Sequence, residues 1–377
     1  MSYHLISWGA NSHGQLGQGM LSEECVLPHE VGLSSCSLNP RKIRKIVGGA
    51  GHTLILDDDG RVYSCGWNNK GQAGFSKGEH VLTFREVGGK LGNKAIADIA
   101  CGWDCSAALT TEGTLFLWGS NSYGQLGKHP TTLRWAGEPF EVALGRKIKR
   151  VSIGLRHTAL ITEARKVLVA GAGNKGQLGL SPSEDKESFE PVYSFTEVPT
   201  LKNIAGVSCG QHHTIAVTVN GSLYAFGDNK HGQLGLDTDL VSKSSFPIRV
   251  TDRFDSSVQT RSGWSHVIAL SEGQIHSWGR NTYGQLGCAE FDGSSSWRTM
   301  RVEGIPKVLQ VSVGSEHNVV LTEEGRILCW GWNEHGNCGN GHNRDVRLPE
   351  KLLLPFEAVP THIGSGAGHS FAVIRRS

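Results

Sequence analysis

Histidines recur in this chain at one place in a repeated phrase, and histidine is the side chain best suited to proton transfer near neutral pH. The phrase is Gly-x-x-His, and its copies end at His52, His157, His213, His266, His317 and His369. A seventh copy, Gly102 to Cys105, has cysteine in the histidine position. A side chain that returns in nearly every unit of a repeat performs the same structural task in each. We therefore expect hydrogen-bonded core histidines rather than an acid–base centre.

Two further patterns could bind a cofactor or a metal. The segment 171–176 matches the dinucleotide fingerprint Gly-x-Gly-x-x-Gly, but no helical pattern follows that could bind a pyrophosphate. Cys101 and Cys105 lie close together, but no second pair at metal-ligand spacing accompanies them. The nine cysteines are odd in number, and we expect them to be buried free thiols. The sequence predicts no catalytic residue, no cofactor and no metal.

The elements that must position these residues repeat about every 50 residues, which is typical of a repeat architecture. A nine-residue phrase, in its fullest form Gly-x-Asn-x-x-Gly-Gln-Leu-Gly, has copies that start at Gly9, Gly66, Gly119, Gly171, Gly227, Gly279 and Gly331. The segment 171–176 is the fourth copy of this phrase, with Gly173 in the asparagine position. The repeat therefore explains the apparent dinucleotide fingerprint.

Each repeat is predicted to consist of strands and turns. Apolar runs at 53–56 and 62–65 are separated by Asp58-Asp-Gly60, which is a hairpin signal. Ahead of each Gly-x-x-His a segment such as Lys42–Ile46 alternates polar and apolar residues, as a strand with one buried face does. No segment keeps a helical period over three turns, so the chain is predicted to be all-β.

The two ends of the chain predict a closed ring. The strand expected at Ser2–Trp8 elsewhere follows a Gly-x-x-His strand, and the strand expected at His369–Ile374 lacks its following partner. If these two strands pair, seven blades close into a β-propeller without a long exposed edge. A blade cannot bury its faces without neighbours, so residues 1–377 are predicted to form one domain.

The two phrases together resemble the repeat of the regulator of chromosome condensation superfamily, over essentially the whole chain. Segments such as 100–104, 154–157, 262–266, 314–318 and 329–338 are similar to those of the secretion-regulating guanine nucleotide exchange factors. Some of them are also similar to the propeller of the killer-toxin-insensitivity group. The first resemblance implies exchange activity toward a small GTPase. The second implies a small zinc-ribbon partner in diphthamide synthesis and Elongator-dependent tRNA modification.

Composition favours a monomeric chain located in the cytoplasm, with the nucleus as a second compartment. Lys and Arg number 37 against 35 Asp and Glu, so no overall basic field would recruit nucleic acid directly. No apolar run approaches the length of a membrane span, and the first residues lack a signal-peptide pattern. Membrane insertion is therefore not expected.

Charged clusters stand at a few positions. The basic segments Arg41–Lys45 and Arg146–Arg150 each precede a Gly-x-x-His and alternate with isoleucine. A solvated strand face is the favoured interpretation, and a polyanion or acidic-partner site is the alternative. The acidic insert Ser183–Glu187 is predicted to form a loop tip.

Residues that differ between otherwise similar copies are candidates for partner recognition, because the scaffold does not require them. Exposed tryptophan flanked by carboxylates suits a protein-binding patch. The residues predicted to bind a partner are Trp103, Asp104, Trp264, Glu316, Trp332, Glu334 and His335.

Two functions are compatible with these residues. As an exchange factor, the protein would release nucleotide by binding the nucleotide-free GTPase more tightly, without covalent chemistry. The repeats differ by at most five residues in length, which leaves little room for the β-wedge that the resemblance to the regulator of chromosome condensation implies. As a scaffold, the protein would hold a zinc-ribbon partner. A tryptophan photosensor of the plant ultraviolet-receptor type is not expected, because Leu155 separates the tryptophan-bearing copies.

Overall fold

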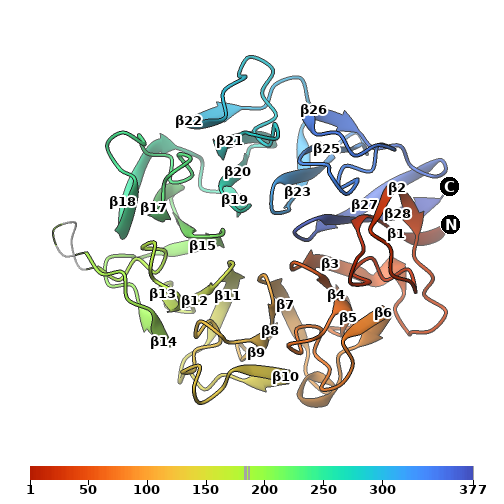
Figure 1. The fold of residues 1–377 in the computed structure, drawn as a ribbon, viewed down its shortest axis with the longest axis horizontal. Helices are drawn as coiled ribbons and strands as arrows, with labels where there is room; N and C mark the ends of the chain where they lie inside the picture. Colours follow the sequence, from red (N-terminus) through yellow and green to blue (C-terminus); the bar gives the residue numbers. More distant parts are fainter. Residues whose placement is uncertain (182–184, 186, 377) are drawn as a thin grey trace.

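The computed structural model describes residues 1–181, 185 and 187–376, except for the side chains of residues 251–253. In this part of the chain, 28 strands form seven four-stranded antiparallel sheets that radiate from a common axis (Figure 1). The prediction of an all-β, seven-bladed propeller is confirmed. Most of the acidic insert predicted at 183–187 lies outside the described residues.

The strands follow one another from the axis outward in blades 1 to 6. Blade 1 contains β3 (Ile43–Gly48), β4 (His52–Asp57), β5 (Val62–Trp67) and β6 (His80–Glu86). Blade 2 contains β7 (Ile96–Cys101), β8 (Cys105–Thr110), β9 (Leu115–Ser120) and β10 (Trp135–Glu141). Blade 3 contains β11 (Ile148–Ile153), β12 (His157–Thr162), β13 (Val167–Gly171) and β14 (Val192–Glu197). Blade 4 contains β15 (Ile204–Cys209), β16 (His213–Thr218), β17 (Ser222–Asp228) and β18 (Lys243–Arg253). Blade 5 contains β19 (Gln259–Ser262), β20 (His266–Ser271), β21 (Gln274–Arg280) and β22 (Ser295–Arg301). Blade 6 contains β23 (Val308–Val313), β24 (His317–Thr322), β25 (Ile327–Gly331) and β26 (Val346–Lys351).

Blade 7 joins the two ends of the chain. From the axis outward it contains β27 (Ala358–Ser365), β28 (His369–Arg376), β1 (Ser2–Ala10) and β2 (Glu24–Glu30). β1 and β28 are antiparallel, and their register runs from Ser2 opposite Arg376 to Gly9 opposite His369. The predicted closure is confirmed, and β2 extends it by a second strand.

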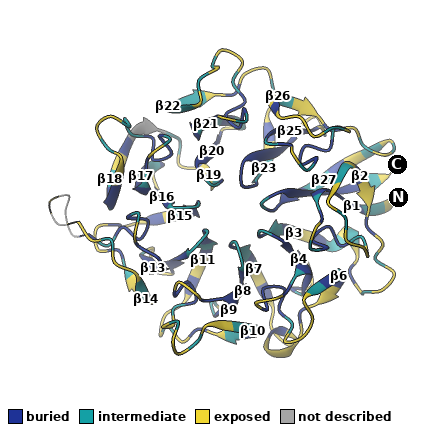
Figure 2. Cartoon of the chain, viewed as in Figure 1, coloured by how far each residue is buried: buried dark blue, intermediate teal, exposed yellow. Residues whose placement is uncertain are grey.

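The core of each blade lies in its two middle strands. Every residue of β12 is buried, whereas no residue of the outermost strand β14 is. Figure 2 shows the same gradient around the ring, with buried residues toward the middle strands and exposed residues on outer strands and loops. The faces of neighbouring blades therefore bury one another, which is why the repeats need each other to fold.

Two short 3-10 helices interrupt the strand pattern: η1 (Pro40–Lys42) and η2 (Gly89–Leu91). η1 corrects the expectation that a strand begins at Lys42. The Asn39 side chain accepts a hydrogen bond from the Arg41 backbone N–H at 3.0 Å, which caps the helix. β3 begins at Ile43, directly after the helix.

The periodic histidines join one blade to the next. His52 Nε2 lies 2.8 Å from Ser106 Oγ in blade 2, and that hydroxyl donates its only proton to the Gln72 carbonyl at 2.8 Å. His52 must therefore donate from Nε2. The same bond, at 2.8 to 2.9 Å, joins His157 to Thr214, His266 to Asn318, His317 to Ser370 and His369 to Thr53. These bonds confirm the expectation of core histidines.

All six histidines are neutral because the protein interior surrounds them. Burial lowers the pKa to about 3 for His52, His157, His213, His317 and His369. Burial also lowers the pKa of His266, to about 4. Their Nδ1 atoms are buried without a hydrogen-bond partner. Within the described residues, only His266 Nδ1 has a carboxylate nearby, that of Glu316 at 3.9 Å, so in the other five a proton added at Nδ1 would gain no acceptor.

One of the six histidines lacks its link to the next blade, and this link can be restored. Neither ring nitrogen of His213 has a partner, because Val267 occupies the position that holds a hydroxyl or an amide in the linked blades. Val267→Thr should raise the free energy of unfolding by about 1 kcal/mol, since a buried donor gains an acceptor. Urea denaturation of the two proteins measures the change. Val319→Thr, in a buried position without such a donor, is the control and should destabilise; stabilisation by both variants would contradict the mechanism.

Candidate functional site

The seven Gly-x-x-His turns converge around the axis at one end of the propeller. Backbone bonds link successive turns: Trp264 N–H donates to Ser315 O at 2.7 Å, and Ser315 N–H donates to Ala367 O at 3.0 Å. Ala367 N–H donates to Gly49 O at 2.9 Å. Among the described residues, such bonds join six of the seven neighbouring pairs of turns. The mouth of the central channel is therefore a hydrogen-bonded ring.

This close approach explains the glycine that begins each turn. A Cβ on Gly102 would lie 2.8 Å from the Gly154 carbonyl oxygen of the next blade, nearer than real Cβ contacts come. The glycine is needed for contact between the blades, and the residue after it is free to vary.

The loops of the nine-residue phrase lie on the same side as the turns. Ser120 N–H in one such loop donates to Asp104 O in a turn at 2.8 Å, and Trp332 N–H donates to Glu316 O in the same way. We call this side of the propeller, formed by the seven turns and seven loops, the turn face. The opposite side, which carries hairpins such as Asp57–Gly60, is the hairpin face.

Trp103 and Trp264 meet at the centre of the turn face. They follow the innermost strands of blades 2 and 5, and their ring centroids are 5.3 Å apart at a tilt of 41°. Both are partly exposed, and they border a cavity of about 110 Å³ that all seven turns line. Both tryptophans were predicted to bind a partner, and the structure brings their rings into contact at the centre of one face.

Asp104 lies beside this pair in a half-buried position. Burial raises the pKa of the Asp104 carboxyl, whereas a hydrogen bond with Ser120 and the charges of Lys70 and Arg156 oppose the rise. Asp104 therefore has positive neighbours on both adjoining blades.

A second aromatic cluster surrounds Trp332 in blade 6. Its indole Nε1 donates to the Glu334 carboxylate at 3.2 Å, and its ring centroid lies 5.3 Å from that of His335. The Tyr283 ring of blade 5 lies 6.5 Å away. Three of the residues predicted to bind a partner therefore lie together in one patch on the turn face: Trp332, Glu334 and His335.

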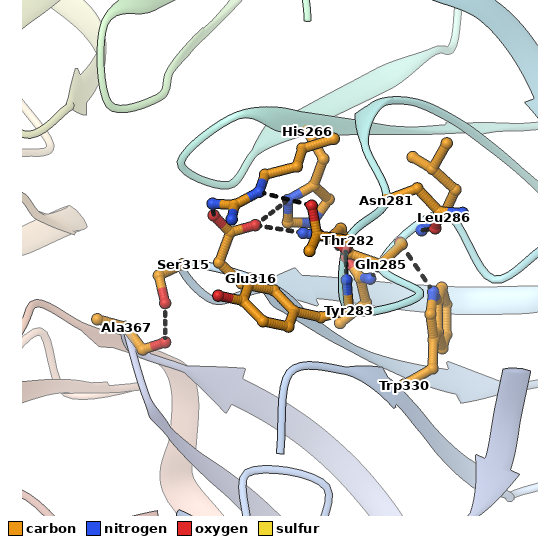
Figure 3. A network of polar contacts seen from close by, with 12 residues as sticks. His266, Asn281, Thr282, Tyr283, Gln285, Leu286, Ser315, Glu316, Trp330 and Ala367 are labelled. Atoms are coloured by element: carbon orange, nitrogen blue, oxygen red, sulfur yellow. Dashed lines mark hydrogen bonds and ion pairs between the residues drawn. The ribbon is translucent and has the colours of Figure 1, made fainter. Parts of the chain in front are cut away.

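Glu316 has a different position from the one predicted. It is only 3% exposed; its carboxylate accepts hydrogen bonds from Gln285 and from Arg280, the latter at 3.0 Å, and lies 3.9 Å from His266 Nδ1 (Figure 3). Burial raises the pKa of Glu316, and the Arg280 charge opposes the rise. Glu316 cannot touch a partner directly, which corrects the expectation. Instead it holds Arg280, whose guanidinium lies 5.0 Å from the Tyr283 ring centroid.

The sequence interpretation missed a set of large side chains around the tryptophan pair. Tyr123 is 39% exposed, and the Arg156 guanidinium lies 4.3 Å from its ring centroid. His13 stacks on Trp67 with ring centroids 4.4 Å apart. The signal was in the sequence: the fifth residue of the nine-residue phrase is always large, namely His13, Lys70, Tyr123, Lys175, His231, Tyr283 and His335.

The structure offers little for covalent chemistry or metal binding within the described residues. No group of three or more His, Cys, Asp or Glu side chains is placed to hold a metal ion there. All nine cysteines are unpaired, and five of them are buried. Burial raises the pKa of Cys101 to about 12 and that of Cys105 well above the usual value. No helix in the described part of the chain has the length and apolar character needed to cross a membrane.

The fold and its converging turns define a closed, seven-bladed repeat propeller with one conspicuous aromatic face. The chain belongs to the RCC1-like domain family, whose domain matches residues 4–372. It is 35% identical to the secretion-regulating guanine nucleotide exchange factor of Bos taurus, over 98% of this chain and 82% of that protein. It is 33% identical to the ultraviolet-B receptor UVR8 of Arabidopsis thaliana, over 92% of this chain and 77% of that protein.

Solved structures agree on the fold. The crystal structure of Prp20p from Saccharomyces cerevisiae, described together with its binding to Gsp1p and histones, superposes with a TM-score of 0.85 at 22% identity. The match covers 100% of this chain and 92% of that one. None of these three relatives bears on the resemblance to the killer-toxin-insensitivity group, so a zinc-ribbon partner stays a prediction.

Proposed function

We propose that this propeller binds and regulates a small GTPase as a guanine nucleotide exchange factor, and that the turn face is its docking surface. The contact between Trp103 and Trp264 carries the proposal. Two large aromatic rings that remain partly exposed at the centre of a face are the kind of anchor that dominates protein–protein binding energies.

The surroundings of the pair support docking of a protein. A ring of aromatic and charged side chains, including Tyr123 with Arg156 and Tyr283 with Arg280, encircles the centre. Aromatic residues and arginine are enriched at such interfaces. Half-buried Asp104 and exposed Glu334 add acidic groups that would fix the orientation of a partner.

The mechanism needs no nucleophile or general base in the propeller. Exchange is accelerated when a protein binds the nucleotide-free GTPase more tightly than the nucleotide-bound form. A rigid face suits this task, because the partner rather than the propeller then changes shape. The 35% identity to a bovine protein named as an exchange factor favours this function over other binding roles.

Replacement of either central tryptophan should weaken partner binding without unfolding the protein. Trp103→Ala and Trp264→Ala should each cost about 2 kcal/mol, roughly a 30-fold loss of affinity, if both rings are hot spots. Their combined cost should be smaller than the sum, because the rings contact each other. Calorimetry and release of fluorescent GDP from a panel of purified small GTPases provide the measurement.

The controls are basic residues outside the turn face. Lys42→Ala removes a partly exposed charge that pairs with Asp59, Lys149→Ala removes an exposed charge, and both changes should cost little. Binding that depends on these lysines rather than on the tryptophans would move the interface off the turn face. If the protein accelerated GDP release from none of the GTPases in the panel, this result would argue against exchange activity.

A further inference from the structure

One hairpin of the propeller has an arginine in a position where the comparable hairpins have glycine. In blade 3, Arg165 N–H donates to Thr162 O at 2.9 Å, and the φ angle of Arg165 is 59°. A positive φ costs free energy for any residue with a Cβ, whereas glycine adopts it freely. The fold therefore does not require arginine here, and the side chain rather than the backbone explains its presence. Four other hairpins close with the same backbone bond, and each has glycine at this position: Gly60, Gly113, Gly221 and Gly325.

The exposed Arg165 side chain lies among other basic side chains on the hairpin face. The Arg165 carbonyl oxygen accepts a hydrogen bond from Ile204 N–H at 3.0 Å, which brings the segment that contains exposed Lys202 to this hairpin. From the other side, Glu163 N–H donates to Lys147 O at 2.9 Å. Three segments of the chain therefore meet here. We call their basic side chains the basic patch: Arg146, Lys147, Arg165, Lys166 and Lys202.

Most of the charge of the basic patch is not balanced. Glu197 Oε1 lies 3.1 Å from Lys166 Nζ, and Glu197 Oε2 lies 3.4 Å from Arg146 Nη1, so one carboxylate serves two cations. Among the residues that the structure describes, the other three members of the patch form no ion pair. The hairpin itself adds one more carboxylate, that of Glu163. About three positive charges therefore remain available to a ligand.

The shape of this surface restricts what the ligand can be. A hollow of about 550 Å³ lies between the segment 146–147 and the hairpin 162–166, and the side chains of Glu163 and Glu197 line it too. A flat bilayer of anionic lipid cannot enter a hollow, and the two carboxylates repel a uniformly negative surface. The cations are spread over three segments, so they do not converge on one point as a site for a small anion requires. An extended polypeptide can instead place each acidic side chain beside a separate cation.

We propose that the basic patch docks an extended acidic segment of a partner protein on the hairpin face of blade 3. Complementary charges speed association and fix the register of such a segment more than they raise its affinity. The complex should therefore weaken as the salt concentration rises. The patch lies on the face opposite to Trp103 and Trp264, so it is separate from the proposed GTPase surface and does not depend on exchange activity.

Fluorescence anisotropy of a labelled peptide of alternating glutamate and glycine, at low ionic strength, tests the patch. The wild type should bind the peptide, and Arg165→Gly and Lys147→Ala should each bind it about three- to fivefold more weakly, because one exposed ion pair is lost. Arg165→Lys keeps the charge and should bind nearly as well as the wild type. Arg326→Gln removes an exposed arginine from the hairpin of blade 6, and this matched control should leave the affinity unchanged.

Thermal melting separates a role in binding from a role in folding. Arg165→Gly should melt at the temperature of the wild type or higher, because glycine adopts the positive φ without strain. Gly325→Arg makes the opposite change in blade 6 and should melt at a lower temperature. A Cβ at Gly325 would have no atom nearer than 3.9 Å, so the conformation alone causes this loss. A lower melting temperature for Arg165→Gly would show that the arginine is structural and would overturn the proposal.

Vesicles that contain phosphatidylserine and a DNA duplex are the competing probes. If Arg165→Gly weakened binding to the vesicles or to the duplex but not to the peptide, the surface would belong to a membrane or to nucleic acid, and the proposal would be wrong. Trp103→Ala should bind the peptide as the wild type does, because that side chain lies on the opposite face. Absence of peptide binding to the wild type, or equal binding to Arg165→Gly, would also overturn the proposal.

Discussion

Removal of residues 1–9 should abolish most of the thermal stability of the propeller. The deletion removes β1 from the middle of blade 7 and leaves β28 without its hydrogen-bonding partner. It also removes the buried side chains of Leu5, Ile6 and Trp8. The loss of three large core side chains costs on the order of 10 kcal/mol, which equals the whole stability of a typical domain. Circular dichroism should therefore show no cooperative melt comparable to that of the intact chain.

A circular permutant provides the control for this deletion. Ser2 lies opposite Arg376, so a two-residue Asn-Gly turn can join these ends as a hairpin, and a new start can be placed ahead of η1. Blade 7 would then be continuous in sequence like the other six. The permutant should melt close to the wild type. An unchanged melting temperature after the deletion would refute closure by β1.

As the pH falls, the free energy of unfolding of this propeller should decrease far more steeply than that of a typical domain. The six periodic histidines have a pKa of about 3 or 4 in the folded state, whereas an unfolded histidine has a pKa of about 6.5. Because their folded pKa values are lowered, only the unfolded state gains protons as the pH falls below about 6.5. Stability is therefore retained above that pH and lost below it.

The size of this effect follows from the number of histidines. Each one lowers the free energy of unfolding by about 1.4 kcal/mol per pH unit once the pH is well below 6.5, so six lower it by about 8 kcal/mol per pH unit. Urea denaturation at pH values from 7.5 to 5 measures this slope. His157→Cys, which copies the turn of blade 2, should reduce the slope by about one sixth. His129→Gln removes an exposed histidine and should leave the slope unchanged. A nearly flat stability between pH 6 and 5 would contradict neutral histidines in the folded state.

The repeated phrases predicted the blades and their closure because glycine and histidine occupy positions that geometry dictates. The outermost strands, such as β2 and β6, were not predicted. They pair along one edge only, their registers shift, and only one residue of β2 and two of β6 are buried, so no periodic apolar pattern marks them. The two middle strands have continuous apolar runs because both of their faces are covered, and the innermost strand alternates because only one of its faces is buried.

The candidate site could be predicted only in part. Trp103 and Trp264 were predicted to bind a partner because they differ from the residues in other copies of the repeat, but their contact depends on the width of the propeller, which no local pattern encodes. Glu316 was predicted to bind a partner because it differs from the residues in other copies of the turn. Arg280 and Gln285, from the preceding blade, cover it, and contacts between blades cannot be seen in a single repeat.

Blade 7, which contains strands from both ends of the chain, also determines when the ring can close during synthesis. β1 is made before blades 1 to 6, but its partner β28 begins only at His369, so at about 5 to 20 residues per second the ribosome needs roughly 20 to 70 seconds to supply it. Throughout that interval the apolar face of β1 has no native partner, while blades 1 to 6 can assemble in order. The nascent chain therefore exposes an unpaired apolar strand ahead of blade 1, which makes β1 a place for a chaperone to bind and for two chains on one messenger RNA to exchange strands.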